Sequence, residues 1–249
     1  APFVTLEDAG VPEGGALSLV VSAAATQTIL AVTRAGNVEV WAVGGERPEK
    51  TFGDGQLRSA ALSADCRRLV TASDGPAQLW DLDSGKRLCA LRGHCGPLVS
   101  AAFSPDGESV LMACLDRTAR LWSAGSGEQL RALTGHEWPL VSAAFSPDGS
   151  QVITASNDGT ARLWSASSGD CLQALRGHEA TLVSAAFAPN GACVLTASAD
   201  TTARLWGAAD GCFRTLRGHT GPLASGTFSP TGAQVLTAGL DGQARLWSV

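Results

Sequence analysis

Short apolar segments alternate with turn sequences along most of the chain. In one stretch, Leu140–Phe145 is apolar, Val152–Ser156 is a second apolar run, and residues 160–164 alternate between polar and apolar types. Runs of this length, bounded by turn residues, predict β-strands rather than helices. The next segment, Cys171–Leu175, is more polar, as expected for an edge strand. We therefore expect four sequential strands here.

The turn residues between these segments support the same prediction. Ser146–Gly149 reads Ser-Pro-Asp-Gly, in which proline presets φ at the second position of a type I turn and glycine relaxes the fourth. Asn157-Asp158-Gly159 predicts a tight hairpin turn. The same order of segments and turns recurs along the chain, and helical periodicity of useful length is absent. The sequence therefore predicts an all-β fold.

The strand pattern belongs to an internal repeat. Trp recurs at positions 41, 80, 122, 164, 206 and 247, at intervals of 39, 42, 42, 42 and 41 residues. A Gly-His pair precedes each of the last four, with the His 28 residues before the Trp. Aligning Gly135–Trp164 with Gly177–Trp206 gives 21 identities in 30 positions. Repeats of this length with a Gly-His…Trp-Asp signature resemble the WD-repeat β-propeller family.

The resemblance implies a fold class, which is all-β with four-stranded antiparallel blades arranged about an axis. Six Trp units predict a six-bladed β-propeller formed by a single domain over residues 1–249. The sequence stops after the third strand of the last unit, and Phe3–Leu6 matches Phe213–Leu216 at three of four positions. We therefore expect residues 1–8 to be the edge strand of the last blade and to close the ring. The alternative left open is that the six repeats belong to a longer propeller or array.

The resemblance also implies a buried, hydrogen-bonded tetrad of His, Thr, Asp and Trp in each blade. A buried indole N–H needs an acceptor, and a hydroxyl can accept from it while donating to a His. Three units carry the complete set: His136, Thr154, Asp158 and Trp164; His178, Thr196, Asp200 and Trp206; and His219, Thr237, Asp241 and Trp247. The third unit keeps His94, Asp116 and Trp122 but has Met112 in place of the Thr.

The first two units depart further from this pattern. The second has Asp54 in place of the His, together with Thr71, Asp74 and Trp80, and the first retains only Trp41. An arginine precedes the Trp by two residues in each of the last four units, at Arg120, Arg162, Arg204 and Arg245. We expect these arginines to lie against the neighbouring blade and to pair with carboxylates.

A partner is expected on one face of the predicted disc. By resemblance, partners dock on the surface that carries the loops before the inner strands and the Asp turns, which we call the top face. Most of the exposed positions expected there are apolar, and Trp138 stands where the other intact units have Gly96, Ala180 and Gly221. The predicted contact residues are Val99, Leu115, Trp138, Pro139, Val141, Asn157, Val183, Ala199 and Leu240. Two alternatives stay open: Trp138 folds over its own blade, or the apolar rim reflects an Ala-rich sequence.

Composition removes several classes of function. The net charge is −5, with 18 basic and 23 acidic residues and no basic run, which disfavours nucleic acid. Polar residues interrupt the most apolar stretch, residues 16–32, so we expect no membrane insertion. His136 and His178 start like a zinc-protease motif, but Leu140 and Leu182 occupy the second His position. Because the tetrads account for all four His, we expect no catalytic residue, no cofactor and no metal.

The seven cysteines include no C-x-x-C pair, which favours a reducing, intracellular and cytoplasmic location. Cys66 and Cys193 are expected in turns, but no spacing supports a redox or metal role for them. The sequence thus predicts a non-enzymatic scaffold for a protein or peptide partner, as a monomeric ring or a subunit of a complex. Two alternatives are a permanently packed structural subunit or fragment of a larger protein, and an enzyme with a site in the central channel.

Overall fold

The computed structural model describes residues 16–21, 28–33, 37–42, 47–52, 57–207 and 211–249. These residues form strands and turns without any helix, as the sequence pattern predicts. The described strands of the first half are β1 Ala16–Val21, β2 Thr28–Thr33, β3 Val38–Ala42, β4 Lys50–Phe52, β5 Leu57–Leu62, β6 Arg68–Ser73, β7 Ala77–Asp81, β8 Arg87–Leu91, β9 Leu98–Phe103, β10 Ser109–Cys114, β11 Ala119–Ser123 and β12 Gln129–Leu133. Those of the second half are β13 Leu140–Phe145, β14 Gln151–Ser156, β15 Ala161–Ser165, β16 Cys171–Leu175, β17 Leu182–Phe187, β18 Cys193–Ser198, β19 Ala203–Gly207, β20 Gly211–Leu216, β21 Leu223–Phe228, β22 Gln234–Gly239 and β23 Ala244–Ser248.

Consecutive strands pair antiparallel into six sheets, numbered here in chain order. The first five sheets are β1–β4, β5–β8, β9–β12, β13–β16 and β17–β20, and the sixth contains the three strands β21–β23. The four strands predicted between residues 140 and 175 are confirmed as β13–β16. The predicted turn at Ser146 is confirmed by a hydrogen bond from the Gly149 N–H to the Ser146 carbonyl at 2.9 Å.

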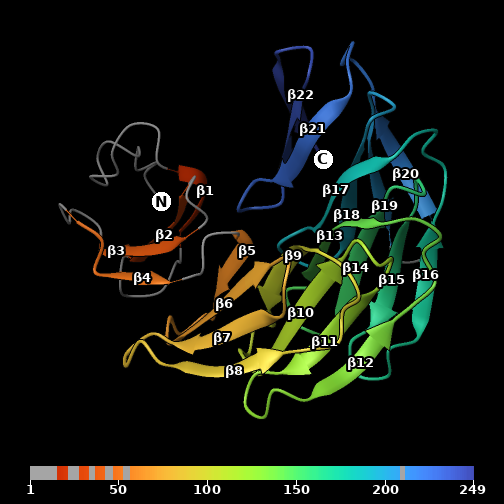
Figure 1. The fold of residues 1–249 in the computed structure, drawn as a ribbon. Coiled ribbons are helices and arrows are strands. Elements are labelled where there is room, and N and C mark those ends of the chain that lie inside the picture. The colour runs from red at the N-terminus through yellow and green to blue at the C-terminus, as the bar shows by residue number, and fades with distance from the viewer. Residues whose placement is uncertain (1–15, 22–27, 34–36, 43–46, 53–56, 208–210) are drawn as a thin grey trace.

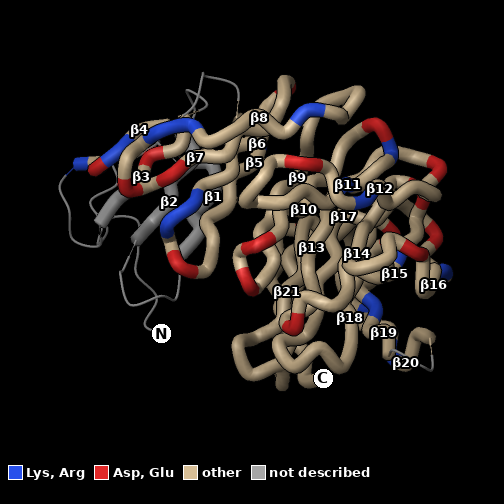
Figure 2. Tube along the Cα trace, turned by 90° about the horizontal axis from the view of Figure 1, so that it is seen from below, with Lys and Arg blue, Asp and Glu red and all other residues tan. Residues whose placement is uncertain are grey.

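The sheets follow one another in an arc, with the first strand of each sheet on the inner side (Figure 1). The inner strands β5, β9, β13, β17 and β21 contact one another in that order. Because successive side chains on a strand point to opposite faces, each sheet that lies between two others presents one face to the sheet before it and one to the sheet after it. Figure 2 shows that acidic and basic residues are interspersed along the chain. Among the described residues, no helix is long and apolar enough to cross a membrane.

The core consists of separate apolar layers between neighbouring sheets. Between the third and fourth sheets, Leu111 and Leu121 pack with Val152 and Trp164, and all four are buried. The recurring Trp thus lies on the face of its sheet that meets the preceding sheet. Burying one such Leu side chain stabilises the fold by roughly 1.5–3 kcal/mol, so these layers hold the stack together.

The sixth sheet has one uncovered face in the part of the chain that the structure describes. Leu236 and Leu246 are 43% and 62% exposed, whereas Leu195 and Leu205, at the same positions of the fifth sheet, are 1% and 0% exposed. Over the described residues, the six sheets do not close into a ring, so the predicted closed propeller is not confirmed. The predicted closing strand, residues 1–8, lies outside the described residues.

Candidate functional site

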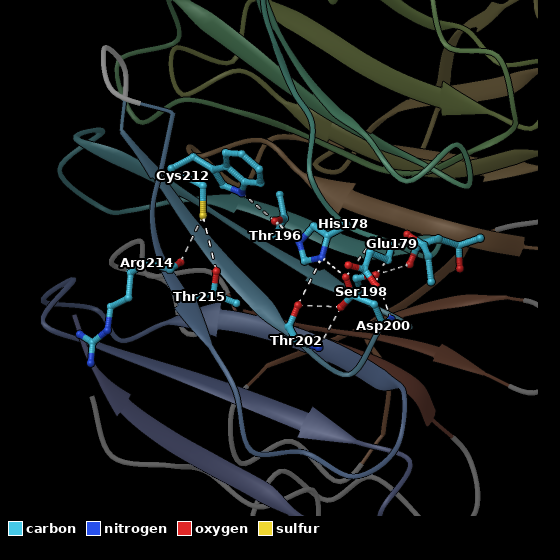
Figure 3. A network of polar contacts seen from close by, with 12 residues as sticks. His178, Glu179, Thr196, Ser198, Asp200, Thr202, Cys212, Arg214 and Thr215 are labelled. Atoms are coloured by element: carbon cyan, nitrogen blue, oxygen red, sulfur yellow. Dashed lines mark hydrogen bonds and ion pairs between the residues drawn. The ribbon is translucent and has the colours of Figure 1, made fainter.

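A chain of hydrogen bonds links four side chains in the fifth sheet (Figure 3). The Trp206 Nε1 N–H donates to Thr196 Oγ1 at 2.8 Å. Thr196 Oγ1 lies 2.8 Å from His178 Nε2, and His178 Nδ1 lies 2.7 Å from Asp200 Oδ2. Since an ionised carboxylate only accepts, Nδ1 carries the ring proton, and Nε2 of the neutral ring accepts from the Thr196 hydroxyl. Every ring nitrogen and hydroxyl in this series of hydrogen bonds therefore has a partner.

The fourth and sixth sheets repeat this geometry. In the fourth, the Trp164–Thr154, Thr154–His136 and His136–Asp158 distances are all 2.8 Å. In the sixth, the equivalent distances are 2.8, 2.9 and 2.9 Å, through Trp247, Thr237, His219 and Asp241. In each of these three sheets, residues that are distant in sequence thus come together at the same position. We call each such set a tetrad.

The Asp of each tetrad also fixes the loops of the top face. Asp200 Oδ2 accepts from the Glu179 backbone N–H at 3.1 Å, and Oδ1 accepts from the Thr202 hydroxyl at 2.7 Å. The Ser198 hydroxyl donates to the carbonyl of Thr181 at 2.9 Å. One carboxylate and one hydroxyl therefore tie the loop before the inner strand to the Asp turn. This arrangement holds the top-face backbone in place.

Burial and hydrogen bonding set the charges in the tetrad. Burial alone would raise the pKa of Asp200, but hydrogen bonds from Thr202 and His178 outweigh it and lower the pKa to about 2. Burial lowers the pKa of His178, although Asp200 opposes this shift. At neutral pH the pair is therefore a neutral imidazole donating to a carboxylate. The His178 side chain is only 1% exposed, which keeps substrates away from the ring.

The glycine of each Gly-His pair has a positive φ that other residues rarely adopt, and it lies beside an arginine. Gly177 has φ +145°, and a Cβ there would lie 2.6 Å from Arg204 Nη1. Gly135 stands in the same relation to Arg162, with φ +152° and a Cβ distance of 2.6 Å. The expectation that these arginines pair with carboxylates is therefore wrong for most of them. Of the four, and among the described residues, only Arg120 forms such an ion pair, with Asp116 at 3.9 Å, and its Nη1 also donates to the Gly93 carbonyl.

The third sheet lacks the hydroxyl that completes a tetrad. Met112 is fully buried in place of the Thr, and His94 Nε2 and Trp122 Nε1 are buried without a hydrogen-bond partner. The distance from His94 Nδ1 to Asp116 Oδ2 is 3.3 Å, longer than in the three complete tetrads. A buried polar group without a partner costs about 1–3 kcal/mol, so the third sheet is less well stabilised at this point.

The second sheet keeps only part of the set. The Trp80 Nε1 N–H donates to Thr71 Oγ1 at 2.9 Å. Asp74, which the sequence aligns with the tetrad Asp, instead forms an exposed ion pair with Arg58. Asp54 and the side chain of Trp41 lie outside the described residues.

The residues predicted to contact a partner fall into two groups. Trp138 is 62% exposed and Leu115 is 38% exposed, so neither is covered by its own blade. Leu240 and Asn157 are also exposed. The other five are half-buried: Val99, Pro139, Val141, Val183 and Ala199.

A β-bulge explains why the three valines are half-buried. Leu140 pairs with Ser156 and Ser142 with Ala155, which leaves Val141 as an extra residue on the inner strand. Val141 packs against the core between the fourth and fifth sheets. Val99 and Val183 occupy the same position in their sheets. Since a bulge redirects a side chain, these valines pack partly against the cores between neighbouring sheets.

The comparison with known families agrees with this geometry. The family described as "WD domain, G-beta repeat" matches residues 85–123, 127–165, 169–207 and 210–248, more than half of the chain. The chain belongs to the WD40-repeat family. The WD40 repeat-containing protein HOS15 of Arabidopsis thaliana is 49% identical over 43 residues. This match covers 17% of the present chain and 7% of HOS15.

Several further polar residues of these WD40 repeats hold the loops, and the tetrad pattern alone does not predict them. Ser156 and Ser198 each bond loop carbonyls, and Thr160 and Thr202 each bond the tetrad Asp. The recurring Ser-x-Asp-x-Thr spacing could have revealed them. Cys193, predicted in a turn, is instead the first residue of β18, because the turn ends one residue earlier. Cys66 does lie in a turn, with φ +57°, where the equivalent residue of the third sheet is Gly107.

Proposed function

We propose that this WD40-repeat chain is a non-catalytic scaffold that presents its apolar top face to a protein or peptide partner. The observation that carries the proposal is the 62% exposure of Trp138 at a position where other repeats have Gly or Ala. A large indole left in water gains most by being covered, and Trp is enriched at binding hot spots. Repeats of this family generally mediate protein–protein interactions.

The fixed loops support this proposal. The tetrad residue Asp158 and the neighbouring Ser156 hold the top-face backbone on both sides of Trp138, since the Glu137 N–H donates to Asp158 and the Ser156 hydroxyl to the Trp138 carbonyl. A surface that is already ordered loses little entropy when a partner binds. The partner-contacting set is Trp138, Leu115, Asn157 and Leu240 at the rim, with Val99, Pro139, Val141, Val183 and Ala199 behind them.

The proposal includes the setting in which the scaffold works. We expect residues 1–249 to act as one domain, without a cofactor, in the cytoplasm. Cys95 and Cys171 are exposed free thiols, which a reducing compartment preserves. Neither nucleic acid nor membrane insertion belongs to this function.

A capture experiment tests the scaffold proposal. The immobilised wild-type chain is compared with Trp138→Ala and with Leu172→Ala, which removes an equally exposed apolar side chain from the outer strand β16. We expect proteins retained by wild type and by Leu172→Ala to bind Trp138→Ala roughly 30-fold more weakly, the effect of losing one hot-spot residue. Equal retention by Trp138→Ala and wild type would contradict the proposal, provided that the two melt at the same temperature.

A second candidate function is that of a permanently packed structural subunit or part of a larger multi-repeat assembly. The uncovered face of the sixth sheet, with Leu236 and Leu246, favours it. Light scattering after size exclusion separates the two candidates. A stable monomer supports the scaffold, whereas association that Leu246→Asp abolishes supports permanent packing.

A further inference from the structure

A group of metal-ligand side chains occurs at the incomplete tetrad of the third sheet. A ring nitrogen of His94, Cys114 Sγ and a carboxylate oxygen of Asp116 all lie within 4.8 Å of one another. Cys114 is fully buried, and the His94 and Asp116 side chains are 5% and 11% exposed. Nitrogen, thiolate and carboxylate ligands in one buried cluster match the donors that Zn²⁺ takes in proteins.

The cluster exists because the third repeat differs from its neighbours at two positions. Cys114 replaces a serine, Ser156 or Ser198, whose hydroxyl bonds the carbonyls of the preceding loop. The Cys114 thiol donates to the equivalent carbonyl, that of Gly96, at 3.1 Å. Met112 replaces the tetrad Thr. The two substitutions together supply a soft ligand and remove the hydroxyl on the other side of the His.

The missing hydroxyl frees the imidazole to bind a cation. In the complete tetrads, the Thr hydroxyl donates to Nε2 and thereby keeps the ring proton on Nδ1, facing the Asp. His94 Nε2 has no such donor. The ring proton can therefore reside on Nε2, which leaves a lone pair on Nδ1 toward Asp116 and Cys114.

The spacing of one ligand pair, His94 Nδ1 and Asp116 Oδ2, also suits an ion. A tetrahedral ion that binds nitrogen and oxygen at about 2.0–2.1 Å holds the two atoms about 3.3 Å apart. His94 Nδ1 and Asp116 Oδ2 are 3.3 Å apart, whereas the same atoms are 2.8 Å apart for His136 and Asp158. The thiolate and the carboxylate together would neutralise a divalent cation. Arg120, 3.9 Å from Asp116, opposes binding and limits the affinity.

A cavity adjoins the His94 side of the cluster. It has a volume of about 360 Å³, lies where the second and third sheets meet, and is lined by Asp74, His94, Cys95 and Gly96 among others. Three protein ligands leave one position of a four-coordinate site for water. We propose that His94, Cys114 and Asp116 form a binding site for a four-coordinate divalent cation of the zinc class.

Cobalt titration of the metal-free, reduced chain of residues 1–249 tests this proposal. Co²⁺ is the probe because a thiolate ligand produces a charge-transfer band, and Zn²⁺ then displaces the Co²⁺. We expect the wild type to bind one Co²⁺ per chain with such a band. Cys114→Ser, which restores the residue of the next two repeats, should lose the band and bind at least roughly tenfold more weakly. Cys95→Ser, at the exposed neighbouring thiol, should leave both unchanged.

A second variant keeps the proposal testable if Cys114→Ser folds poorly. Met112→Thr retains all three ligands but restores the hydroxyl beside His94 Nε2, so it should weaken Co²⁺ binding. Absence of a thiolate band in wild type overturns the proposal, as does a band that persists in Cys114→Ser or disappears in Cys95→Ser. Equal binding by Met112→Thr and wild type overturns the role assigned to the unpartnered imidazole nitrogen.

Discussion

Thr154 joins two buried side chains of the fourth sheet, and Thr154→Val removes its hydroxyl with almost no change in volume. The substitution leaves Trp164 Nε1 and His136 Nε2, each now 2.8 Å from Thr154 Oγ1, without a partner. Thr154 is fully buried, so water cannot take over these hydrogen bonds. Each orphaned group costs about 1–3 kcal/mol, and the pair therefore about 2–6 kcal/mol. Since valine fills the same space, no cavity contributes to this loss.

Urea unfolding followed by circular dichroism measures this loss of unfolding free energy. Hydrogen exchange of β14 and β15 then locates it, because opening in repeat proteins can be local. Thr134→Val, at an exposed threonine, is the matched control and should change the free energy of unfolding by less than about 0.5 kcal/mol. If Thr154→Val unfolds within 0.5 kcal/mol of the control, the tetrad does not stabilise the blade as argued.

Two further predictions concern acid and the Gly-His pairs. Burial lowers the pKa of His136 and His178, so the unfolded chain binds more protons below about pH 6.5, and the urea midpoint should fall as the pH drops below this value. Hydrogen bonds outweigh burial and lower the pKa of Asp158 and Asp200 to about 2. The stabilisation of the fold by these two carboxylates, present above about pH 4, should therefore be lost as the pH falls toward 2. A urea midpoint that stays constant from pH 7 to 3 would contradict the pKa shifts of both the His and the Asp residues. Gly177→Ala would put a side chain at φ +145°, where Arg204 must also move away from the new Cβ, and should lower the melting temperature. Gly125→Ala, at a glycine without such a φ and with nothing closer than 3.8 Å to its Cβ, should not; equal melting temperatures would refute the backbone-strain argument.

Much of the fold could be predicted because each strand is short and ends at residues with strong local preferences. β13 and β16 have the bounds that the pattern indicates, since Pro147 and Gly149 fix the turn between β13 and β14 through their own backbone geometry. The convergence of His178 on Asp200 could be expected because the resemblance to the WD-repeat family implies it, and the equal spacing in each unit places the same pair at an equivalent position in each blade.

Features that depend on neighbouring elements could not be predicted in this way. The bulge at Val141 arises from the register of β13 on β14, and alternation alone gives no sign of it. The position of Arg204 against Gly177 depends on how a loop returns over the third strand of its sheet. The grouping of Cys114 with His94 was also missed, because the two residues are 20 positions apart and each has an ordinary role in its own segment.

Site-specific photo-crosslinking tests most directly whether the top face is the binding surface. A benzophenone side chain is introduced in turn at Asn157 on the top face, at Leu172 on the outer strand β16 and at Leu246 on the uncovered face of the sixth sheet. We predict that a partner captured by the wild-type chain crosslinks from position 157 and not from 172 or 246. Crosslinking from 172 or 246 without any from 157 would contradict it.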